Sequence, residues 1–419
     1  MNISEAIEYI NAAGIRGSIL GLSRMKKLCD ILGNPEDELK FIHVAGTNGK
    51  GSTACFISTI LTSAGYKTGM YYSPALSGNK DHYMIDGCLI SDEDYSLCVE
   101  SLVEANNKLK AQINEEATQF ELETALAFLY FKMKKCDFVV LETGLGGEED
   151  ATNVVKNKVA CVFTSISYDH MAILGNTLSE IASVKAGIIV NNCPVIAFNS
   201  SSEVIETIQN RCNATGSRLT VVDACPKEYF VNKGIELSLR GTYQRDNALI
   251  AVNTIEELCK LNIDIDEEAI EKGLEIARWP YRYEKISDDP IIYLDGAHNP
   301  DAANRLYESL MEDYYNKDII FVIGMFKDKD CEKVIGKLAP IAKEIYTLTT
   351  LDLNRALSND EIKTIADKYC DKVYSCKDIR EAALLSTKAL INYKNGVVVA
   401  FGSLSYLDAI KKEFNKEKK

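Results

Sequence analysis

No run of apolar residues in this sequence approaches the ~18 residues that a helix needs to cross a bilayer. Basic residues are scattered, apart from those of the tail 411–419, and 61 acidic against 47 basic side chains give a net charge of -14. Nucleic acid and anionic membranes are therefore poor candidates as partners. The 13 cysteines form no C-x-x-C pair, and the sequence does not open with a signal peptide. We expect a cytoplasmic protein with mostly buried, free thiols.

The length and the order of the apolar segments indicate the fold class. A chain of 419 residues is too long for one comfortable hydrophobic core, so two domains are expected. Short apolar runs alternate with amphipathic segments throughout, which is typical of α/β proteins whose parallel sheets carry helices on both faces. We place the first domain at residues 1–279 and a second, smaller one at residues 280–419.

Some segments are less regular than the rest. Residues 75–91 have mixed polarity and no clear period, which predicts a loop with short extended pieces. Residues 229–239 predict a short β-hairpin, and residues 159–166 predict a strand. The stretch Trp279–Glu284, followed by the polar stretch Ser287–Pro290, is the best domain boundary in the sequence.

One stretch has the pattern of a phosphate-binding loop. The apolar run from Phe41 to Ala45 predicts a buried strand, and a helical segment is predicted from residue 52 to 64. Between them lie Gly46, Thr47, Asn48, Gly49, Lys50, Gly51 and Ser52. Glycines let the backbone approach an anion, helix N–H groups point at it, and the lysine can follow the terminal phosphates. The spacing is a variant of the usual G-x-x-x-x-G-K-[ST] pattern, and a tight turn without a ligand is the alternative.

Polar residues follow several predicted strands of the first domain. Ser73, Glu142 and His170 stand at or just past strand ends, and His170 is preceded by Asp169. Ligands of open parallel sheets bind outside these ends, and Mg²⁺ takes few protein groups beside phosphate, so these residues are candidate metal ligands. The alternatives are a solvated carboxylate for Glu142 and a structural imidazole for His170.

Two further candidates are less specific. Lys185 lies near the end of a predicted helix, where burial would favour a neutral amine able to bind carbon dioxide, although an exposed lysine at a helix end is the plainer interpretation. In the second domain, Asp295 and His298 belong to a strand-to-helix turn that presents them to a cleft, unless the turn is purely structural. Arg282 could reach a phosphate or stack on its tyrosine neighbours.

The motifs, taken in chain order, resemble those of one enzyme family. They are His43-Val-Ala-Gly-Thr-Asn-Gly-Lys-Gly-Ser52, Ser73-Pro74, Leu141-Glu-Thr-Gly-Leu-Gly-Gly147, Asp150-Ala-Thr-Asn-Val154, Asp169-His170, Lys185-Ala-Gly-Ile188, Gly241-Thr-Tyr-Gln-Arg-Asp-Asn-Ala248, Trp279-Pro280, Asp295-Gly-Ala-His-Asn-Pro300 and Asn354-Arg-Ala356. Together they resemble folylpolyglutamate synthase and the bifunctional dihydrofolate synthase of the Mur ligase superfamily. The resemblance implies an ATP-binding domain of the Mur ligase type followed by a Rossmann-like glutamate ligase domain.

The resemblance also implies an activity, which is ATP-dependent, ADP-forming addition of L-glutamate to a folate through an acyl phosphate. It implies Mg²⁺, with ATP as co-substrate, and a carbamylated Lys185. The implied catalytic residues are Lys50, Lys185 and His298; the ATP contacts are Gly46 to Ser52, Asn247, Arg282 and Asp295; the metal ligands are Ser52, Ser73, Glu142 and His170; and the substrate contacts are Thr118, Phe120, Asp150 and Thr152. We expect a monomer that binds ATP, L-glutamate and a carboxylate acceptor.

The sequence departs from the family pattern at several positions outside the predicted ATP and metal site. After Ser73-Pro74 the family has His, an aromatic residue and a Glu-Arg pair, whereas this chain has Ala75, Asn79 and Asp81-His82. After Gly146-Gly147 the family has Arg, and this chain has Glu148-Glu149. Val184 replaces the Glu that precedes the lysine. These replacements remove positive charge and add carboxylates, which weakens the prediction that the acceptor is a polyanionic folate. A Mur-type ligase with another carboxylate acceptor, and a non-catalytic ATP-binding regulator, are the alternatives.

Overall fold

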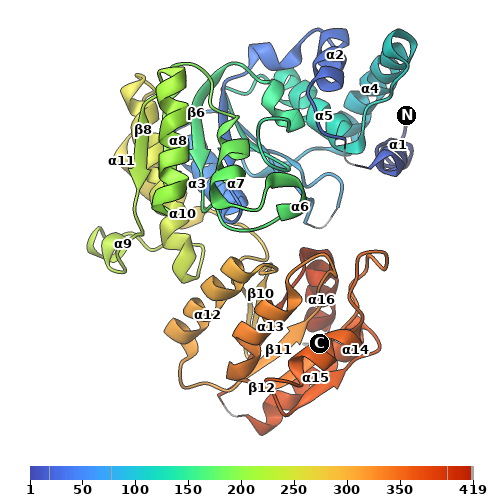
Figure 1. The fold of residues 1–419 in the computed structure, drawn as a ribbon, viewed down its shortest axis with the longest axis vertical. Helices are drawn as coiled ribbons and strands as arrows, with labels where there is room; N and C mark the ends of the chain where they lie inside the picture. Colours follow the sequence, from blue (N-terminus) through green and yellow to red (C-terminus); the bar gives the residue numbers. More distant parts are fainter. Residues whose placement is uncertain (18, 77, 394, 417–419) are drawn as a thin grey trace. The chain divides into compact units, whose positions relative to one another are not determined.

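The protein is described from a computed structural model, which covers residues 1–17, 19–76, 78–393 and 395–416. Its contacts divide the chain into two compact units. Unit 1 comprises residues 1–238 and 246–277, and unit 2 comprises residues 239–245 and 278–419. Figure 1 traces the elements of both units along the chain. The predicted α/β fold class is confirmed, because each unit is built on a mainly parallel sheet with helices packed on it.

Unit 1 contains an eight-stranded sheet in the order β4-β3-β2-β5-β1-β6-β7-β8. Its strands are β1 (Phe41–Ala45), β2 (Thr68–Tyr71), β3 (Tyr83–Ile85), β4 (Cys88–Leu89), β5 (Phe138–Glu142), β6 (Lys158–Phe163), β7 (Val195–Phe198) and β8 (Leu219–Val222). All pairs are parallel except β2 with β3 and β3 with β4. β1 lies between β5 and β6, which places the predicted phosphate loop at the centre of one sheet edge.

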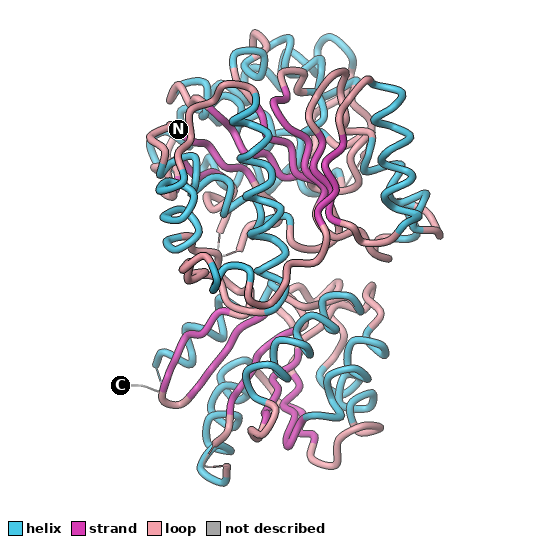
Figure 2. The backbone as a smooth tube through the Cα atoms, turned by 90° about the vertical axis from the view of Figure 1, so that its left-hand side faces the viewer, coloured by secondary structure: helices cyan, strands magenta, loops and turns pink. Residues whose placement is uncertain are grey.

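Helices cover both faces of this sheet, as the tube drawing in Figure 2 shows. The helices between residues 1 and 277 are α1 (Ile3–Ala12), α2 (Ser23–Ile31), α3 (Lys50–Ser63), α4 (Asp92–Ile113), α5 (Gln119–Met133), α6 (Met171–Leu174), α7 (Leu178–Ala186), α8 (Ser202–Thr215), α9 (Tyr229–Asn232), α10 (Thr242–Lys260), whose first residues belong to unit 2, and α11 (Glu267–Ile276). Phe41 packs in a core with α1, α2, α4 and α5, and Ala45 in a core with α7 and α8. Because alternate residues of a strand point to opposite faces, His43 shares their side of the sheet.

Unit 2 contains a six-stranded sheet in the order β13-β12-β11-β14-β10-β9. Its elements are β9 (Glu284–Asp288), β10 (Ile291–Asp295), α12 (Pro300–Tyr314), β11 (Ile319–Ile323), α13 (Cys331–Leu338), β12 (Ala342–Thr347), α14 (Asn359–Ala366), β13 (Val373–Ser375), α15 (Ile379–Ala389), β14 (Val397–Phe401) and α16 (Leu404–Lys416). Only β9 is antiparallel to its neighbour. One core joins the sheet to α12, α13 and α14.

The structure corrects three details of the sequence analysis. Residues 229–239 form no hairpin, because Tyr229–Asn232 is the short helix α9, with Phe230 and Ile235 buried. Ser287 and Asp288 belong to β9, so the polar stretch predicted as a boundary is the turn of a β9–β10 hairpin inside unit 2. β6 ends at Phe163, because the next residues leave the sheet and Ser165 bonds to the phosphate loop.

Two predictions drawn from composition can be compared with the structure. All thirteen cysteines are free, and most are buried, as expected. None of the helices in the described ranges combines the length and the hydropathy that crossing a bilayer requires.

Helices α3 and α11 approach each other closely at one glycine. A Cβ on Gly273 of α11 would lie 2.5 Å from Ile60 Cα and 2.7 Å from Ile60 N. Alanine is normally favoured over glycine inside a helix by up to ~1 kcal/mol. Here the backbone of α3 cannot move aside as a side chain could, so we expect Gly273→Ala to destabilise the protein by about 1–3 kcal/mol. Thermal unfolding followed by circular dichroism measures this.

Gly336 of α13 is the matched control. A Cβ there would meet only the ring end of Tyr369, at 3.2 Å. That side chain is partly exposed and can shift, so Gly336→Ala should keep or raise the unfolding temperature. Equal effects of the two substitutions would contradict the close approach of α3 and α11.

Candidate active site

The loop between β1 and α3 depends on two glycines with positive φ. Gly46 has a φ of 154° and Gly49 a φ of 88°, which residues with a Cβ rarely adopt. Packing requires glycine as well, since a Cβ on Gly46 would lie 1.9 Å from Thr164 Oγ1, and one on Gly49 would lie 2.4 Å from Asn247 Oδ1. The predicted phosphate loop therefore lies directly against the end of β6 and against Asn247 of α10.

The N-terminus of α3 is suited to binding an anion. The helix begins at Lys50, directly after the left-handed Gly49, and no side chain of the described residues caps it. The amide groups of its first turn and the positive end of its dipole therefore face the loop. On the other side, Thr47 N donates to Ser165 O at 2.7 Å, and Thr47 Oγ1 donates to Ser167 O at 3.1 Å. These bonds hold the loop in a conformation that suits phosphate.

Three charged side chains meet at this loop. Lys50 Nζ lies 3.7 Å from Glu142 Oε1 and donates to Thr47 O at 3.4 Å. Lys185 Nζ, from the last turn of α7, donates to Gly46 O at 2.8 Å. Glu142 ends β5 and pairs in register with Val44 of β1. The structure thus brings together Lys50, Glu142 and Lys185, which lie far apart in the sequence.

Lys185 is buried, with 4% of its surface exposed. Burial lowers the pKa of its amine from the ordinary 10.5 to about 7, the charge of Lys50 lowers it further, and Asp169 and Asp150 act in the opposite direction. A substantial fraction of the amine is therefore neutral near pH 7. A neutral amine is the form that reacts with carbon dioxide.

The predicted metal ligands share one edge of the sheet. Ser73 follows β2, Glu142 ends β5, and Ser52 lies in α3 after β1. These three strands are neighbours, and β6, which precedes His170, is next to β1. His170 has its backbone N bonded to Asp169 Oδ1, and its side chain is 43% exposed. In the described ranges no group of three His, Cys, Asp or Glu could hold a metal. Mg²⁺ bound to phosphate takes few protein groups, so Ser52, Ser73, Glu142 and His170 stay predicted ligands.

In unit 2, Asp295 organises the turn that follows β10. Its Oδ2 accepts hydrogen bonds from Tyr243 OH at 2.7 Å and Tyr283 N at 2.8 Å, and its Oδ1 accepts one from Ala297 N at 2.8 Å. Burial raises the pKa of Asp295, while the bond from Tyr243 and the charge of Arg282 oppose the rise. Sequence reasoning did not assign Tyr243, although it lies within the quoted Gly241–Ala248 motif.

The other two predicted residues of unit 2 surround the same turn. The ring of His298 bonds through Nδ1 to Gly296 O at 2.8 Å, so in the neutral form this nitrogen carries the proton. A Cβ on Gly296 would lie 2.8 Å from Arg282 Nη1. Asp295 and His298 belong to the turn between β10 and α12, as the strand-to-helix pattern predicted, and Arg282, which precedes β9, lies against the same turn.

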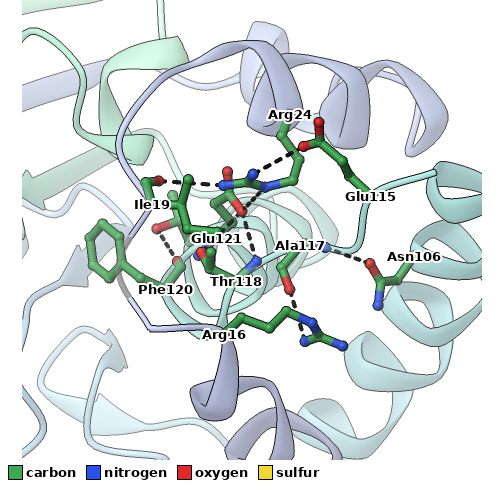
Figure 3. Close-up of polar contacts among 10 residues, drawn as sticks. Arg16, Ile19, Arg24, Asn106, Glu115, Ala117, Thr118, Phe120 and Glu121 are labelled. Atoms are coloured by element: carbon green, nitrogen blue, oxygen red, sulfur yellow. Dashed lines mark hydrogen bonds and ion pairs between the residues drawn. The ribbon is translucent and has the colours of Figure 1, made fainter. Parts of the chain in front are cut away.

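Thr118 and Phe120 lie at the start of α5, in the polar cluster of Figure 3. Thr118 N and Oγ1 both donate to Glu121 Oε2, at 2.8 and 3.0 Å. Arg24 Nε donates to the same oxygen at 2.7 Å, and both members of this ion pair are buried. Sequence reasoning missed Arg24 and Glu121. The signal for Glu121 was its place three residues after Thr118, which forms a capping box.

Asp150 and Thr152 pack against the loop that follows Glu142. Asp150 Oδ2 accepts from Leu145 N at 2.7 Å, and Oδ1 accepts from Thr152 N at 3.0 Å and from Thr152 Oγ1 at 2.5 Å. Both side chains are buried. Direct substrate contact stays a prediction for these two residues. The contacts in the structure give them a further role, which is to shape the loop.

The positions that depart from the family pattern lie in different environments. His82 is buried; its Nδ1 bonds to Tyr72 O at 2.7 Å, and its Nε2 lies 3.9 Å from Glu123 Oε1. Asn79 donates to Asn11 Oδ1 at 2.6 Å. Ala75 is half-buried and the side chains of Glu148 and Glu149 are exposed. Thus the acidic pair faces solvent, whereas His82 is part of the interior near the end of β2.

Comparison with known families places this fold and site in one class of enzymes. Residues 44–255 match the Mur ligase middle domain, and residues 281–404 match the Mur ligase glutamate ligase domain. The protein is thus a Mur-type ligase that forms C–N bonds.

Relatives with assigned names make the family more specific. The chain is 36% identical over 411 residues to the dihydrofolate synthase/folylpolyglutamate synthase of Bacillus subtilis, covering 94% of each chain. It is 33% identical to the folylpolyglutamate synthase of Lacticaseibacillus casei, covering 85% of this chain and 87% of that protein. The chain therefore belongs to the folylpolyglutamate synthase and dihydrofolate synthase family, and the predicted resemblance is confirmed.

Solved structures agree with this assignment. The folylpolyglutamate synthase of Mycobacterium tuberculosis, complexed with ADP and AMPPCP, is similar with a TM-score of 0.91 at 25% identity and covers 99% of both chains. The E. coli protein FolC, in complex with DHPP and ADP, is similar with a TM-score of 0.86 at 25% identity over 100% of this chain and 99% of that one.

The position of Lys50 at the phosphate loop leads to a prediction. We expect Lys50→Ala to lower kcat by at least ~10²-fold, because the ammonium stabilises charge that develops on transferred phosphate. The folded state should persist, since among the described residues the Lys50 ammonium makes only a long bond to Thr47 O and a weak ion pair with Glu142. Steady-state kinetics and circular dichroism measure the two effects.

Lys156→Ala is the control, because the Lys156 side chain is 77% exposed and pairs weakly with Asp37. It should leave kcat unchanged. Near-normal turnover by Lys50→Ala would remove the assignment of the phosphate loop.

Proposed function

We propose that this enzyme adds L-glutamate to a folate at the expense of ATP, as a cytoplasmic monomer. The observation that carries the proposal is the meeting of Lys50, Glu142 and the buried Lys185 at one phosphate-type loop. A loop that only bound a nucleotide would have little need for a buried, partly neutral lysine beside it.

The proposed reaction has two steps. A carboxylate oxygen of the acceptor attacks the γ-phosphorus of ATP, ADP leaves, and an acyl phosphate forms. The amine nitrogen of glutamate then attacks the acyl carbon, the C–O bond to phosphate breaks, phosphate leaves, and the amine loses a proton to give the amide. Lys50 and the amides of Gly49 to Ser52 would hold the phosphates and offset charge that develops during transfer.

The residues present fit a magnesium ion. The carboxylate of Glu142 lies next to the phosphate loop and would repel a triphosphate unless a cation stood between them. Ser52, Ser73, Glu142 and His170 are the proposed ligands. When bound, the ion would polarise the phosphates and neutralise part of their charge.

Lys185 is proposed to carry a carbamate. Its neutral amine would attack the carbon of carbon dioxide, a C–N bond would form as one C=O π bond opens, and one proton would leave, which converts the neutral amine into a carbamate anion near the loop. The pKa of about 7 supports this, since the unprotonated amine is abundant at neutral pH. In unit 2, Arg282 and Asp295 are proposed nucleotide contacts, and so is Asn247 in unit 1; His298 is proposed to act at the acyl phosphate.

The acceptor is proposed to be a folate-type carboxylate, with Thr118 and Phe120 lining its site and Asp150 and Thr152 as further contacts. The names of the relatives support this, because they include both folylpolyglutamate and dihydrofolate synthases. A ligase with another carboxylate acceptor is the second candidate, favoured by the buried His82 where the family has arginine.

One experiment separates these candidates. Phosphate release from ATP is measured with Mg²⁺ and L-glutamate, with and without tetrahydrofolate or dihydropteroate. Release that requires tetrahydrofolate supports folylpolyglutamate synthase activity, and release with dihydropteroate supports dihydrofolate synthase activity. Release with neither, but with another carboxylate, overturns the folate proposal and leaves the ligase class standing.

The carbamate makes a prediction that depends on pH. Activity in carbon dioxide-free buffer should fall, because no carbamate can form. Below pH ~7 the Lys185 amine is protonated and cannot bind carbon dioxide, so added bicarbonate should restore activity less well at pH 6 than at pH 8. Lys185→Ala should be inactive and partly restored by added formate or acetate.

Lys185→Arg is the control for charge, because arginine keeps a cation and forms no carbamate under these conditions. It should be inactive and not respond to formate. The carbamate proposal would fail if formate and acetate restored nothing and the mass of the intact protein never included carbon dioxide at Lys185.

A further inference from the structure

A buried chain of hydrogen bonds connects β1 to the loop that follows Glu142. His43 of β1 lies 2.9 Å from Thr152 Oγ1 through its Nε2, and Thr152 Oγ1 lies 2.5 Å from Asp150 Oδ1. Asp150 in turn accepts from Leu145 N. His43 and Thr152 are 0% exposed and Asp150 is 3% exposed, so water does not compete with these bonds.

The directions of these bonds follow from the donors available. The Thr152 hydroxyl donates to Asp150 Oδ1, and this bond uses its single proton. The Thr152 oxygen must then accept from His43, which requires a proton on Nε2. His43 Nδ1 has no hydrogen-bond partner among the described residues. A proton on this nitrogen would be a buried donor without an acceptor, so the proton belongs on Nε2. Burial and the nearby charge of Lys158 lower the pKa of His43 well below its usual value, so the ring stays neutral.

The loop held by this chain adjoins Glu142 and packs against the backbone of Lys185. It begins directly after Glu142, and Thr143 N donates to Val44 O at 3.0 Å. A Cβ on Gly147 would lie 2.6 Å from Lys185 O, and a Cβ on Gly144 would lie 2.4 Å from Phe120 Cζ. The loop therefore packs between the start of α5 and the backbone of the residue that would carry the carbamate.

We propose that His43 is a positioning residue, which acts through Thr152 and Asp150 to hold the loop 143–147 against Lys185 and thereby sets the positions of Glu142 and Lys185. This inference rests on the proposed function. His43 touches no reacting atom in this role. Its contribution is to keep the hydroxyl of Thr152 directed at Asp150, so that the carboxylate remains bound to the loop amides.

Two substitutions of His43 test the Nε2 donor. His43→Gln can place an amide N–H near the position of Nε2, whereas His43→Asn is too short to reach Thr152. We expect His43→Asn and Thr152→Val each to lower kcat by about 10- to 100-fold, as is typical when a supporting hydrogen bond is lost. His43→Gln should retain most of the activity.

A double variant separates positioning from stability. If the two residues act in one chain, His43→Asn with Thr152→Val should lose no more kcat than the worse single variant. A merely structural role predicts normal kcat per folded molecule, with losses of stability that add. Thr254→Val is the matched control, because Thr254 is equally buried but its hydroxyl only donates to Ile250 O within α10; it should leave kcat unchanged.

The ring itself gives a readout that needs no turnover. The chain has four histidines, so histidine labelled with nitrogen-15 gives few ring signals. One ring should be the neutral Nε2–H tautomer, fail to titrate between about pH 5 and 8, disappear in His43→Gln and shift in Thr152→Val. An Nδ1–H tautomer, a titrating ring, or additive kcat losses would overturn the proposal.

If the wild-type protein turns over no acceptor, the proposed function fails separately. The same variants are then compared by calorimetric binding of an unreactive ATP analogue with Mg²⁺. Coupled losses of affinity would support the positioning role, and unchanged or additive affinities would overturn it.

Discussion

The bond between the buried amine of Lys185 and the carbonyl of Gly46 is the contact on which the first unit's site depends. It joins the end of α7 to the loop between β1 and α3, and it keeps a basic group where water is excluded. Burying a charged lysine normally costs so much free energy that such a position is unfavourable for it. The lysine is tolerated because the carbonyl accepts a hydrogen bond from its amine and because its pKa falls to about 7. The lowered pKa of Lys185 therefore has the same cause as its packing, which is burial.

Both units use a buried carboxylate to shape the turn that follows a strand. In unit 1, Asp150 accepts hydrogen bonds from Leu145 N, in the loop after β5, and from Thr152 N. In unit 2, Asp295 at the end of β10 accepts hydrogen bonds from Tyr283 N and Ala297 N. Burial raises the pKa of both groups, and donated hydrogen bonds offset part of the rise. Such a carboxylate fixes a loop without adding a hydrophobic core to it, which suits segments that must stay open to ligands.

Much of the fold could be predicted because its signals are local. The apolar run Phe41–Ala45, the glycines that follow it and the start of α3 are neighbours in sequence, and their order indicates a strand, a turn and a helix. The segment 229–239 was predicted wrongly as a hairpin, because Phe230 and Ile235 are buried by a helical turn rather than by strand pairing. β9 was missed for a similar reason, since its polar residues form a strand only when β10 lies beside them.

By itself, the sequence determined the α/β class, the position of the phosphate loop and the family, because these depend on residue types at short or ordered spacings. Tertiary structure alone decided which distant residues meet: Lys185 with Gly46, Lys50 with Glu142, Arg24 with Glu121, and His43 with Thr152. It also decided which charges are buried. The physical reason is that hydrogen bonds and pKa shifts depend on distance and on exclusion of water, and neither is set until the sheet and its helices have packed together.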